Sequence, residues 1–538
     1  MPLSSKESIT FPFKKVVLVI IRSETVFIRL EELCRLLLAD RRIQCLFTVP
    51  KPISRFDRHL ENTISSYGCI VIPWDIALEH EFDLAIACSP NGAIELIDAP
   101  LIILEHGPAL SKKAAASDTK NLIERLGGRQ QRSILAIPTG DDLPNDPPPD
   151  INIEIVGDPI RDSMLKYGFL RPDFREVLGI GDRALIALSS TWGCNSLMAL
   201  APELSATLLS ELPANEFAFA LILHPYTWNA HGAWQIETWL RKELASGLIL
   251  VPHVQGWQAT ILASDCVIGD HGSVTHYAAL AQIPTLLFSK SLDESASKSV
   301  LVQRTLSRST IVAEKDDIAR KVREVVGDSA RHPSSTLYHF PWEKNSAKRI
   351  ADIVYSELDL EPNCDEFSAL TLDLIAPTPI DGNTHAFRTV SELLCNTGAH
   401  LHASISVYPA SLPNGALSYD GHLFATIGKS SPQILREADV LLVALEGAGQ
   451  MPSQLLSRYP RCQHIAYLTQ NGCYLYSRSP SKHYRIPIRD QNDLTAIRAA
   501  MLVLEEGAIA CIVHEPHEKT RSIEPASIEP SDIEDLFA

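Results

Sequence analysis

The sequence predicts an α/β protein with two Rossmann-like, doubly wound domains that face a cleft, followed by a smaller C-terminal α/β region. Two observations carry this prediction. Short strands that are apolar throughout alternate with segments of helical spacing, which is typical of parallel sheets covered by helices on both faces. This alternation occurs twice, and at 538 residues the chain exceeds what one hydrophobic core usually holds.

The first series begins with a continuous apolar strand at residues 16–21, and residues 27–38 then have large apolar side chains at helical spacing. Further strands are expected at residues 45–49, 68–73, 82–88 and 101–104, each bounded by polar or turn residues. Residues 1–150 are therefore predicted to form the first Rossmann-like domain.

A proline-rich acidic segment at residues 140–150 cannot continue a helix or a sheet, so it is predicted to be a surface linker. In the second series, strands are expected at residues 184–188, 217–223, 248–251, 266–268 and 285–288, and helices at 200–212, 232–245, 256–263 and 345–358. Residues 151–360 are thus predicted to form the second domain. The carboxyl ends of the two sheets should face one cleft.

A third region, residues 361–515, has strand candidates at 370–375, 400–407, 440–445, 464–468 and 508–513 and helix candidates at 386–395, 432–438 and 494–506. It is expected to be an additional α/β domain that could bind a protein partner or self-associate. Residues 516–538 are polar, acidic and proline-bearing, which predicts a disordered tail.

Composition restricts the class of ligand. The formal net charge of −17 argues against a broad electrostatic contact with nucleic acid, and no apolar run is long enough to span a membrane. The eleven cysteines are scattered without CxxC spacing, which indicates free thiols in a reducing cytoplasm and predicts no metal site. We therefore expect a cytoplasmic protein with small-molecule ligands.

The most informative stretch is the polar corner at residues 269–275, which follows an apolar run and precedes a helix-like segment. Free backbone N–H groups at such a corner bind anions, so Gly272, Ser273, Val274 and Thr275 are expected to face a phosphate. Asp270 could hold a ligand hydroxyl or orient His271, and the alternative is a plain helix start with Asp270 or Ser273 as its N-cap.

Two histidines follow predicted strands at the side where open α/β sheets bind ligands. His106 comes two residues after the strand at 101–104, and its chemistry suits a general base. The alternative is a histidine that only hydrogen-bonds its own loop. His224 ends the strand at 217–223 and could neutralise charge on a departing nucleotide, or it could pack on Tyr226 and Trp228. The tryptophans Trp228, Trp234 and Trp239 are expected in core or hinge packing.

Five short motifs in this order resemble the CDP-glycerol glycerophosphotransferase family, the teichoic-acid polymerases, whose fold is the GT-B glycosyltransferase fold. Residues 106–112, HGPALSK, are similar to HGTPLK, and residues 157–162, GDPIRD, to GxPRND. Residues 189–192, SSTW, correspond to APTW, His224-Pro225 to an HP pair, and residues 264–265 with 269–273 to SD followed by TDYSS. The resemblance covers roughly residues 100–290.

The resemblance implies a transferase that moves a glycosyl or glycerophosphoryl group from a nucleotide-activated donor to a hydroxyl acceptor, with no tightly bound cofactor. It implies that the first domain is the acceptor side and the second the donor side. The implied catalytic residues are His106, His224 and Asp270. The implied donor- and phosphate-binding residues are Arg161, Thr191, His271, Gly272, Ser273, Val274 and Thr275.

The chain departs from the family pattern at two places. Ile160 replaces the family arginine, with Arg161 beside it, and His271 and Gly272 replace a tyrosine and a serine. Two alternatives stay open: a sugar-nucleotide 2-epimerase with carboxylates from Asp158, Asp162 or Asp270 near the sugar, and a non-catalytic nucleotide-sugar-binding scaffold.

Overall fold

The computed structural model describes most of the chain. The described residues are 11–53, 57–89, 91–104, 125–126, 129–139, 152–253, 256–288, 307, 309–313, 317–331, 345–362, 384–412, 421–444, 451–469, 472–479, 481–490, 493–515 and 519–529. His106, the linker predicted at 140–150 and the strand predicted at 370–375 lie outside these described residues.

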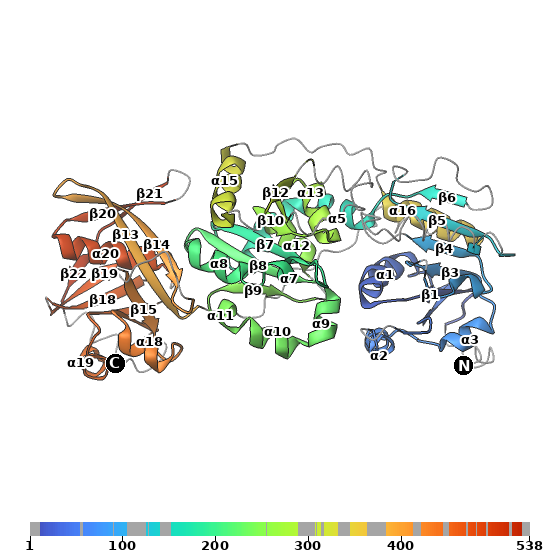
Figure 1. Ribbon diagram of the computed structural model, residues 1–538, viewed down its shortest axis with the longest axis horizontal. Coiled ribbons are helices and arrows are strands. Elements are labelled where there is room, and N and C mark those ends of the chain that lie inside the picture. The colour runs from blue at the N-terminus through green and yellow to red at the C-terminus, as the bar shows by residue number, and fades with distance from the viewer. Residues whose placement is uncertain are drawn as a thin grey trace.

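The first domain is built on a six-stranded parallel sheet in the order β2-β1-β3-β4-β5-β6 (Figure 1). Its strands are β1 (Lys15–Ile20), β2 (Ile43–Thr48), β3 (Leu84–Ala87), β4 (Leu101–Leu104), β5 (Ser133–Ile137) and β6 (Asn152–Ile155), and its helices include α1 (Glu24–Leu37), α2 (Leu60–Ser66) and α3 (Trp74–Leu78). Strand β1 sends Val17 and Val19 into one apolar core and Leu18 and Ile20 into another. Both faces of this sheet are therefore covered, as its unbroken apolar strands predict.

The strand expected at residues 68–73 is wrong. Only Val71 pairs, in a single bridge to Phe47, and α3 begins directly after Pro73. Proline lacks an N–H and ends a sheet ladder, while its fixed φ suits the start of a helix.

The second domain repeats the architecture, with the parallel strand order β12-β11-β10-β7-β8-β9. Its strands are β7 (Ala184–Ser190), β8 (Phe217–Leu223), β9 (Leu248–Val251), β10 (Cys266–Gly269), β11 (Thr285–Phe288) and β12 (Ser309–Val312). Its helices are α5 (Pro159–Tyr167), α6 (Arg171–Val177), α7 (Leu197–Leu200), α8 (Leu204–Glu211), α9 (Pro225–His231), α10 (Ala233–Trp239), α11 (Arg241–Leu244), α12 (Trp257–Ala263), α13 (Ser273–Leu280) and α15 (Ile318–Arg331). The predicted fold class, two doubly wound domains followed by a further region, is confirmed.

Helix α16 (Ser346–Glu357) lies against the first domain, although the sequence placed it in the second (Figure 1). Glu357 pairs with Arg132 at 2.9 Å, and the Tyr355 hydroxyl donates to Asp40 at 3.4 Å. Its buried face, including Ile350 and Val354, joins a core that runs from β1 into the second domain. The predicted boundary at 360 is thus wrong for this helix, because its apolar face finds its partner in the first domain.

The third domain is a ten-stranded mixed sheet in the order β21-β20-β14-β13-β15-β16-β17-β18-β19-β22. Its strands are β13 (Ala386–Asn396), β14 (His400–Pro409), β15 (His422–Thr426), β16 (Val440–Ala444), β17 (His464–Thr469), β18 (Gly472–Arg478), β19 (Ser481–Ile486), β20 (Ala510–His514), β21 (Thr520–Ile523) and β22 (Ala526–Ile528). Its helices are α18 (Pro432–Glu437), α19 (Pro452–Arg458) and α20 (Leu494–Glu506).

Two expectations for this region are wrong. Residues 386–395 form strand β13 rather than a helix, because β14 and β15 pair with it on both sides and that tertiary pairing overrides local spacing. Residues 520–528 of the expected disordered tail form β21 and β22, which pair with β20 and β19. Each of these tail strands supplies a missing edge partner, which stabilises a segment too polar to fold alone.

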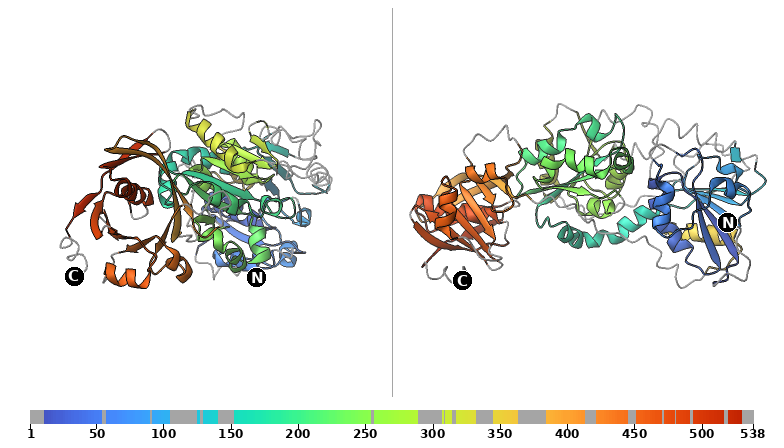
Figure 2. Two further views of the ribbon diagram at one scale, coloured as in Figure 1. Left: turned by 60° about the vertical axis from the view of Figure 1, so that its left-hand side comes forward. Right: turned by 90° about the horizontal axis from the view of Figure 1, so that it is seen from below.

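The sheet curls around α20, because its two outermost strands are joined by only Glu524 and Pro525. The Cα atoms of Ile523 and Ala526 are three steps apart along the chain and thus at most about 11 Å from each other, so the two edges must come close together. Figure 2 shows α20 enclosed by the strands. Nine of its residues from Leu494 to Val503 are buried, as expected of a helix that is apolar around most of its circumference.

Asn215 links the second and third domains. Its side-chain amide bonds to the backbone of β14 in the way that a neighbouring strand would. Its side-chain Nδ2 donates to the Ile405 carbonyl at 2.9 Å, and its Oδ1 accepts from the Val407 N–H at 2.9 Å. The neighbouring Ala214 N–H donates to the Val407 carbonyl at 2.6 Å. These contacts satisfy the part of β14 that extends beyond β20.

Candidate functional site

A pocket lies between the first two domains, at the carboxyl ends of strands β7, β8 and β9. Thr25 and Ile28 of α1 close it from the first domain, and the rest of its wall comes from the second. The second-domain residues that line it are Ser189, Ser190, Thr191, Ile222, Leu223, His224, Pro225, Pro252, His253, Trp257, Gly272, Ser273 and Val274. The structure thus brings together five predicted site residues that lie up to 83 positions apart, since Thr191 and Val274 share one wall.

Asp270 is fully buried and holds the corner from within rather than facing the pocket. Its Oδ2 accepts from the Thr191 N–H, the Thr191 hydroxyl and the Leu197 N–H, each at 2.8 Å. Its Oδ1 accepts from the Gly272 N–H at 3.0 Å. With both oxygens engaged and no exposed surface, Asp270 does not reach a ligand, so the expected contact with a ligand hydroxyl is corrected to a positioning role.

The start of α13 forms one wall of the pocket. Gly272 is its N-cap, and Ser273, Val274 and Thr275 form the start of its first turn, where the N–H groups of a helix precede any acceptor within that helix. A side chain at Gly272 would come within 2.4 Å of the Thr191 methyl group, so the corner is packed as tightly as glycine permits. Backbone N–H groups at a helix start with room for close approach are suited to a phosphate.

Two side chains of the corner do not line the pocket. Thr275 is fully buried, and its hydroxyl lies where a side chain at Gly269 would be. His271 is half-buried, and its Nδ1 has no hydrogen-bond partner among the described residues. The prediction that the Thr275 hydroxyl faces a phosphate is therefore wrong, because the helix turns that side chain toward the end of β10.

His224 lines the pocket and caps helix α9 at the same time. Its Nδ1 accepts from the Tyr226 N–H at 3.0 Å, so a neutral ring carries its proton on Nε2. The ring lies 5.2 Å from Tyr226 and 6.5 Å from Trp192, centre to centre. The ring thus packs on Tyr226, as one of the two alternatives from the sequence has it in part, and His224 also lines the pocket, which leaves its role toward a nucleotide a prediction.

Arg161 is buried away from the pocket, in a segment that joins α5 to α13 and α16. Asp158 caps α5, accepting at Oδ1 from the Arg161 N–H at 3.3 Å, and its Oδ2 accepts from the Tyr277 hydroxyl at 2.6 Å. The Arg161 guanidinium lies 3.7 Å from Asp162, and burial lowers its pKa. Arg161 does not line the pocket, because packed helices enclose its side chain, so the donor-phosphate contact expected of it is corrected to a packing role.

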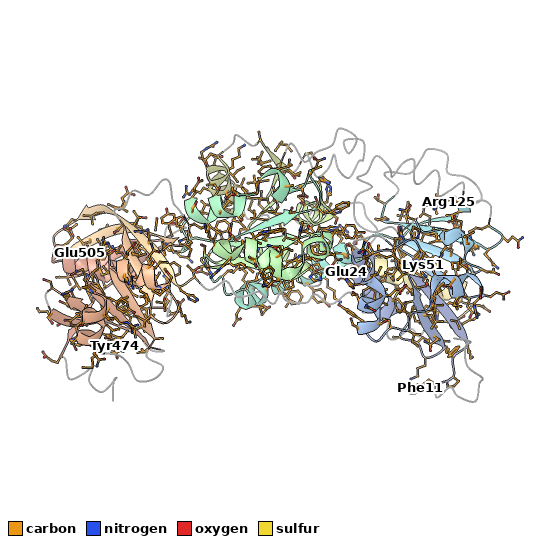
Figure 3. The ribbon with its side chains drawn as sticks, turned by 60° about the horizontal axis from the view of Figure 1, so that its bottom comes forward. Phe11, Glu24, Lys51, Arg125, Tyr474 and Glu505 are labelled. Atoms are coloured by element: carbon orange, nitrogen blue, oxygen red, sulfur yellow. The ribbon has the colours of Figure 1, made fainter. Side chains whose placement is uncertain are left out.

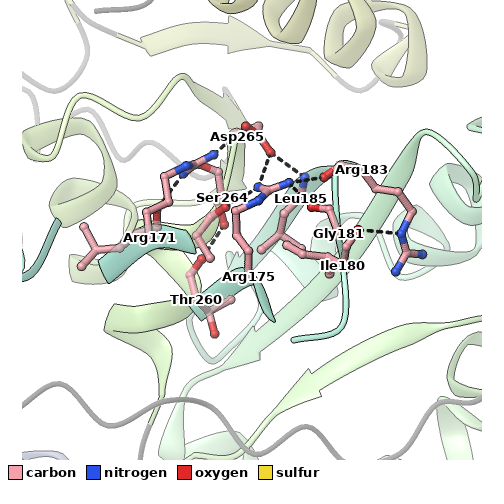
Figure 4. A network of polar contacts seen from close by, with 11 residues as sticks. Arg171, Arg175, Ile180, Gly181, Arg183, Leu185, Thr260, Ser264 and Asp265 are labelled. Carbon is pink, nitrogen blue, oxygen red and sulfur yellow. Dashed lines mark hydrogen bonds and ion pairs between the residues drawn. The ribbon is translucent and has the colours of Figure 1, made fainter. Parts of the chain in front are cut away.

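Asp265, which belongs to the resemblance through residues 264–265, is a packing residue (Figure 4). Its carboxylate accepts from Arg171 Nη2 at 2.6 Å, from Arg175 Nη1 at 3.0 Å and from the Leu185 N–H at 2.8 Å. Leu185 lies at the amino end of β7, whereas the pocket lies at its carboxyl end. The network therefore fastens α6 to the sheet at the side opposite the pocket.

Sequence reasoning missed a polar cluster that crosses between the first two domains. Glu24 of α1 accepts at Oε2 from Asn229 Nδ2 at 2.6 Å, and its Oε1 lies 3.5 Å from His253 Nε2. Asp57 accepts from the Tyr226 hydroxyl at 3.1 Å. Figure 3 shows Glu24 at the boundary between the two domains. In the sequence Glu24 looks like an ordinary acid in the first turn of a helix, so no local signal marks this cluster.

The pKa values of the two carboxylates in this cluster are shifted in opposite directions. Burial opposes ionisation of Glu24, but the hydrogen bonds from His253 and Asn229 prevail and hold its pKa below the usual value. Burial raises the pKa of Asp57, and it also raises the pKa of Tyr226 to about 12 with the nearby Asp57 adding to the effect. The hydrogen bonds therefore favour the charged form of Glu24, whereas burial disfavours the charged form of Asp57.

His276 on α13 makes the stability of this region depend on pH. Burial, with repulsion from His271 adding to it, lowers the pKa of His276 to about 4. The imidazole therefore takes up a proton near pH 6.5 in the unfolded chain but only near pH 4 in the folded chain. The free energy of unfolding consequently decreases as the pH falls from 6.5 to 4. We expect a loss of about 3 kcal/mol from this residue at pH 4 relative to pH 8.

Thermal unfolding at several pH values checks this expectation with His276→Gln as the comparison. The variant should have a flatter stability profile between pH 4 and 6.5 than the parent protein. Parallel profiles for the two proteins would contradict it.

The structure also locates the tryptophans and cysteines that the sequence singled out. Trp228 is buried, but Trp234 and Trp239 are exposed by 75% and 58%, so the expectation of core packing is wrong for these two. Within the described ranges every cysteine is a free thiol, and no three His, Cys, Asp or Glu side chains are grouped as a metal ion requires. No described helix has both the length and the apolar character needed to cross a bilayer.

No protein-family model and no curated protein sequence matches the chain. Among solved structures, the wall teichoic acid polymerase TagF is similar at 13% identity and a TM-score of 0.45, over 64% of this chain and 89% of that one. The S. aureus MnaA–UDP structure is similar at 12% identity and 0.40, over 64% and 98% of the chains. MurG of Acinetobacter baumannii is similar at 12% identity and 0.39, over 64% and 99%.

Proposed function

We propose that the protein is a transferase that moves a glycosyl or glycerophosphoryl group from a nucleotide-activated donor to a hydroxyl acceptor. The donor's phosphates occupy the pocket between the first two domains. One observation carries this proposal: the N-terminus of α13, with its glycine corner, lies beside His224 and Thr191 in a single wall at the carboxyl ends of a parallel sheet. We place the reaction in the cytoplasm, with small molecules as both donor and acceptor.

Each residue of the site has a separate role in the proposed transfer. His106, carried over from the family motif, takes the proton of the acceptor hydroxyl as its oxygen bonds to the transferred carbon or phosphorus. The bond to the nucleotide phosphate then breaks, and its electron pair stays on the phosphate oxygen. The α13 N–H groups and the His224 Nε2–H bind that developing charge. Asp270 keeps Thr191 and Gly272 in place for this step.

The epimerase alternative needs a free carboxylate near the sugar, and the three candidates from the sequence are engaged elsewhere. Asp158 bonds to Tyr277, Asp162 accepts from Ser346 at 2.7 Å, and Asp270 is fully buried. We therefore prefer the transferase.

A thermal-shift screen tests the proposal with CDP-glycerol and with UDP-, GDP- and CDP-sugars, because a ligand that binds the folded state raises its melting temperature. At least one nucleotide should raise it, and His224→Ala should weaken that binding roughly tenfold through the loss of one hydrogen bond to a charged group. His231→Ala is the matched control, since His231 is exposed at the far end of the same helix.

The donor that binds should also be consumed when acceptors are supplied. Binding without turnover would favour the scaffold alternative. A screen in which none of these nucleotides binds would refute the proposal.

A further inference from the structure

His253 lines the pocket and is held from the opposite domain. It follows β9, and its side chain is 29% exposed. Its Nε2 lies 3.5 Å from Glu24 Oε1, and its ring lies 5.4 Å from the buried Trp228 at an angle of 32°. No described residue engages its Nδ1 in a hydrogen bond or an ion pair. Glu24 therefore engages one ring nitrogen, and the described residues leave the other without a hydrogen bond or an ion pair.

We propose that His253 is a catalytic residue that binds the departing phosphate of the donor through Nδ1, and that Glu24 of the first domain positions it. This inference rests on the proposed function and adds two residues that neither the motifs nor the family resemblance assigns. The arrangement has the form of a catalytic dyad, in which a carboxylate orients an imidazole and compensates a positive charge on it.

The chemistry of the dyad follows from its charges. Glu24 is ionised and fixed on its other oxygen by Asn229, so it can hold a protonated imidazole in one orientation. As the donor bond breaks, the electron pair remains on the phosphate oxygen, and Nδ1–H of the imidazolium donates a hydrogen bond to it. The acceptor's proton leaves with the acceptor-side base, so the step balances without a further reactant.

The dyad also couples the reaction to contact between the domains. Glu24 belongs to the first domain, whereas His253 and Asn229 belong to the second. Asp57 and Tyr226 make a second contact of the same kind nearby. When the domains separate, His253 loses its carboxylate, so a bound donor is less exposed to reaction with water before the cleft closes.

The decisive experiment compares Glu24→Gln, His253→Gln and the double variant with the parent protein, using the nucleotide donor found by the thermal-shift screen. Glu24→Gln should lower kcat about 10- to 100-fold while the donor KM changes less than about threefold, because a charge that acts in the transition state is removed. The double variant should be no slower than His253→Gln alone, since the two residues act as a unit. Glu79→Gln, an exposed acid of the same domain, is the control.

A second measurement needs no turnover. Ring ¹⁵N NMR of the histidine-labelled protein, with His253→Gln to assign the signal, should report a hydrogen-bonded Nε2–H at His253 that Glu24→Gln alters. An unaltered signal would overturn the dyad, as would additive losses in the double variant or full kcat in Glu24→Gln. An altered signal in a protein that turns over none of the donors would instead refute the proposed function, and with it the catalytic role of His253.

Discussion

Replacing Asp270 by alanine is expected to lower the free energy of unfolding by about 4 kcal/mol, because each buried polar group left without a partner costs roughly 1–3 kcal/mol. Three backbone N–H groups and the Thr191 hydroxyl would lose their shared acceptor. The residue is fully buried, so bulk water cannot replace it without opening the corner. Calorimetry of the transition that involves the second domain measures this loss.

Two variants control this prediction. Asp270→Asn keeps the shape but offers only one acceptor oxygen, so its loss should lie between those of the parent protein and alanine. Asp352→Ala removes an exposed carboxylate from a surface pair with Lys348 and should change stability by less than about 0.5 kcal/mol. An Asp270→Ala protein as stable as the Asp352→Ala protein would contradict the positioning role.

The second large effect is expected from Gly272→Ala, which should weaken binding of a nucleotide ligand at least tenfold. The added methyl group would lie 2.4 Å from Thr191 Cγ2 and 3.0 Å from Asp270 Oδ1. The backbone at Gly272, with φ of −77°, suits any residue, so the conflict is purely steric. Overpacking of this kind typically costs 1–3 kcal/mol and displaces the groups that meet.

A suppressor makes this test specific. Thr191→Ser removes the methyl group that collides but keeps the hydroxyl that Asp270 accepts from, so the double variant should recover much of the lost binding. Gly168→Ala is the matched control, because nothing lies within 4 Å of a side chain there and its φ is negative. Titration calorimetry measures both, and normal binding by Gly272→Ala would show that the corner does not contact the ligand.

The sequence predicted best those elements whose pattern is local. Strand β8 and helix α20 are apolar over nearly their whole length, and both occur close to where the pattern places them. Strand β13 was missed because its local spacing is that of a helix, and the tail strands β21 and β22 were missed because they are short and polar. Strands β13 and β21 pair with segments close by in the chain, whereas β22 pairs with the distant β19. The side chains of these strands alone do not offset the loss of conformational entropy on folding. The backbone hydrogen bonds and the packing of the completed sheet offset it.

In the candidate site, too, the sequence predicted some features and the tertiary structure decided the others. A glycine-bearing corner follows the buried strand β10, and a histidine follows β8, with β7 between the two strands in the sheet. The sequence predicts that the two meet, because the carboxyl ends of parallel strands lie at one edge of a sheet, and the pocket contains both. The orientation of each side chain was decided by the tertiary structure. Packing turned Asp270 and Arg161 inward, and domain contact placed Glu24 beside His253. Sequence periodicity indicates which residues are buried, whereas most of the partners that hold Asp270 and Glu24 come from segments that are distant in the sequence.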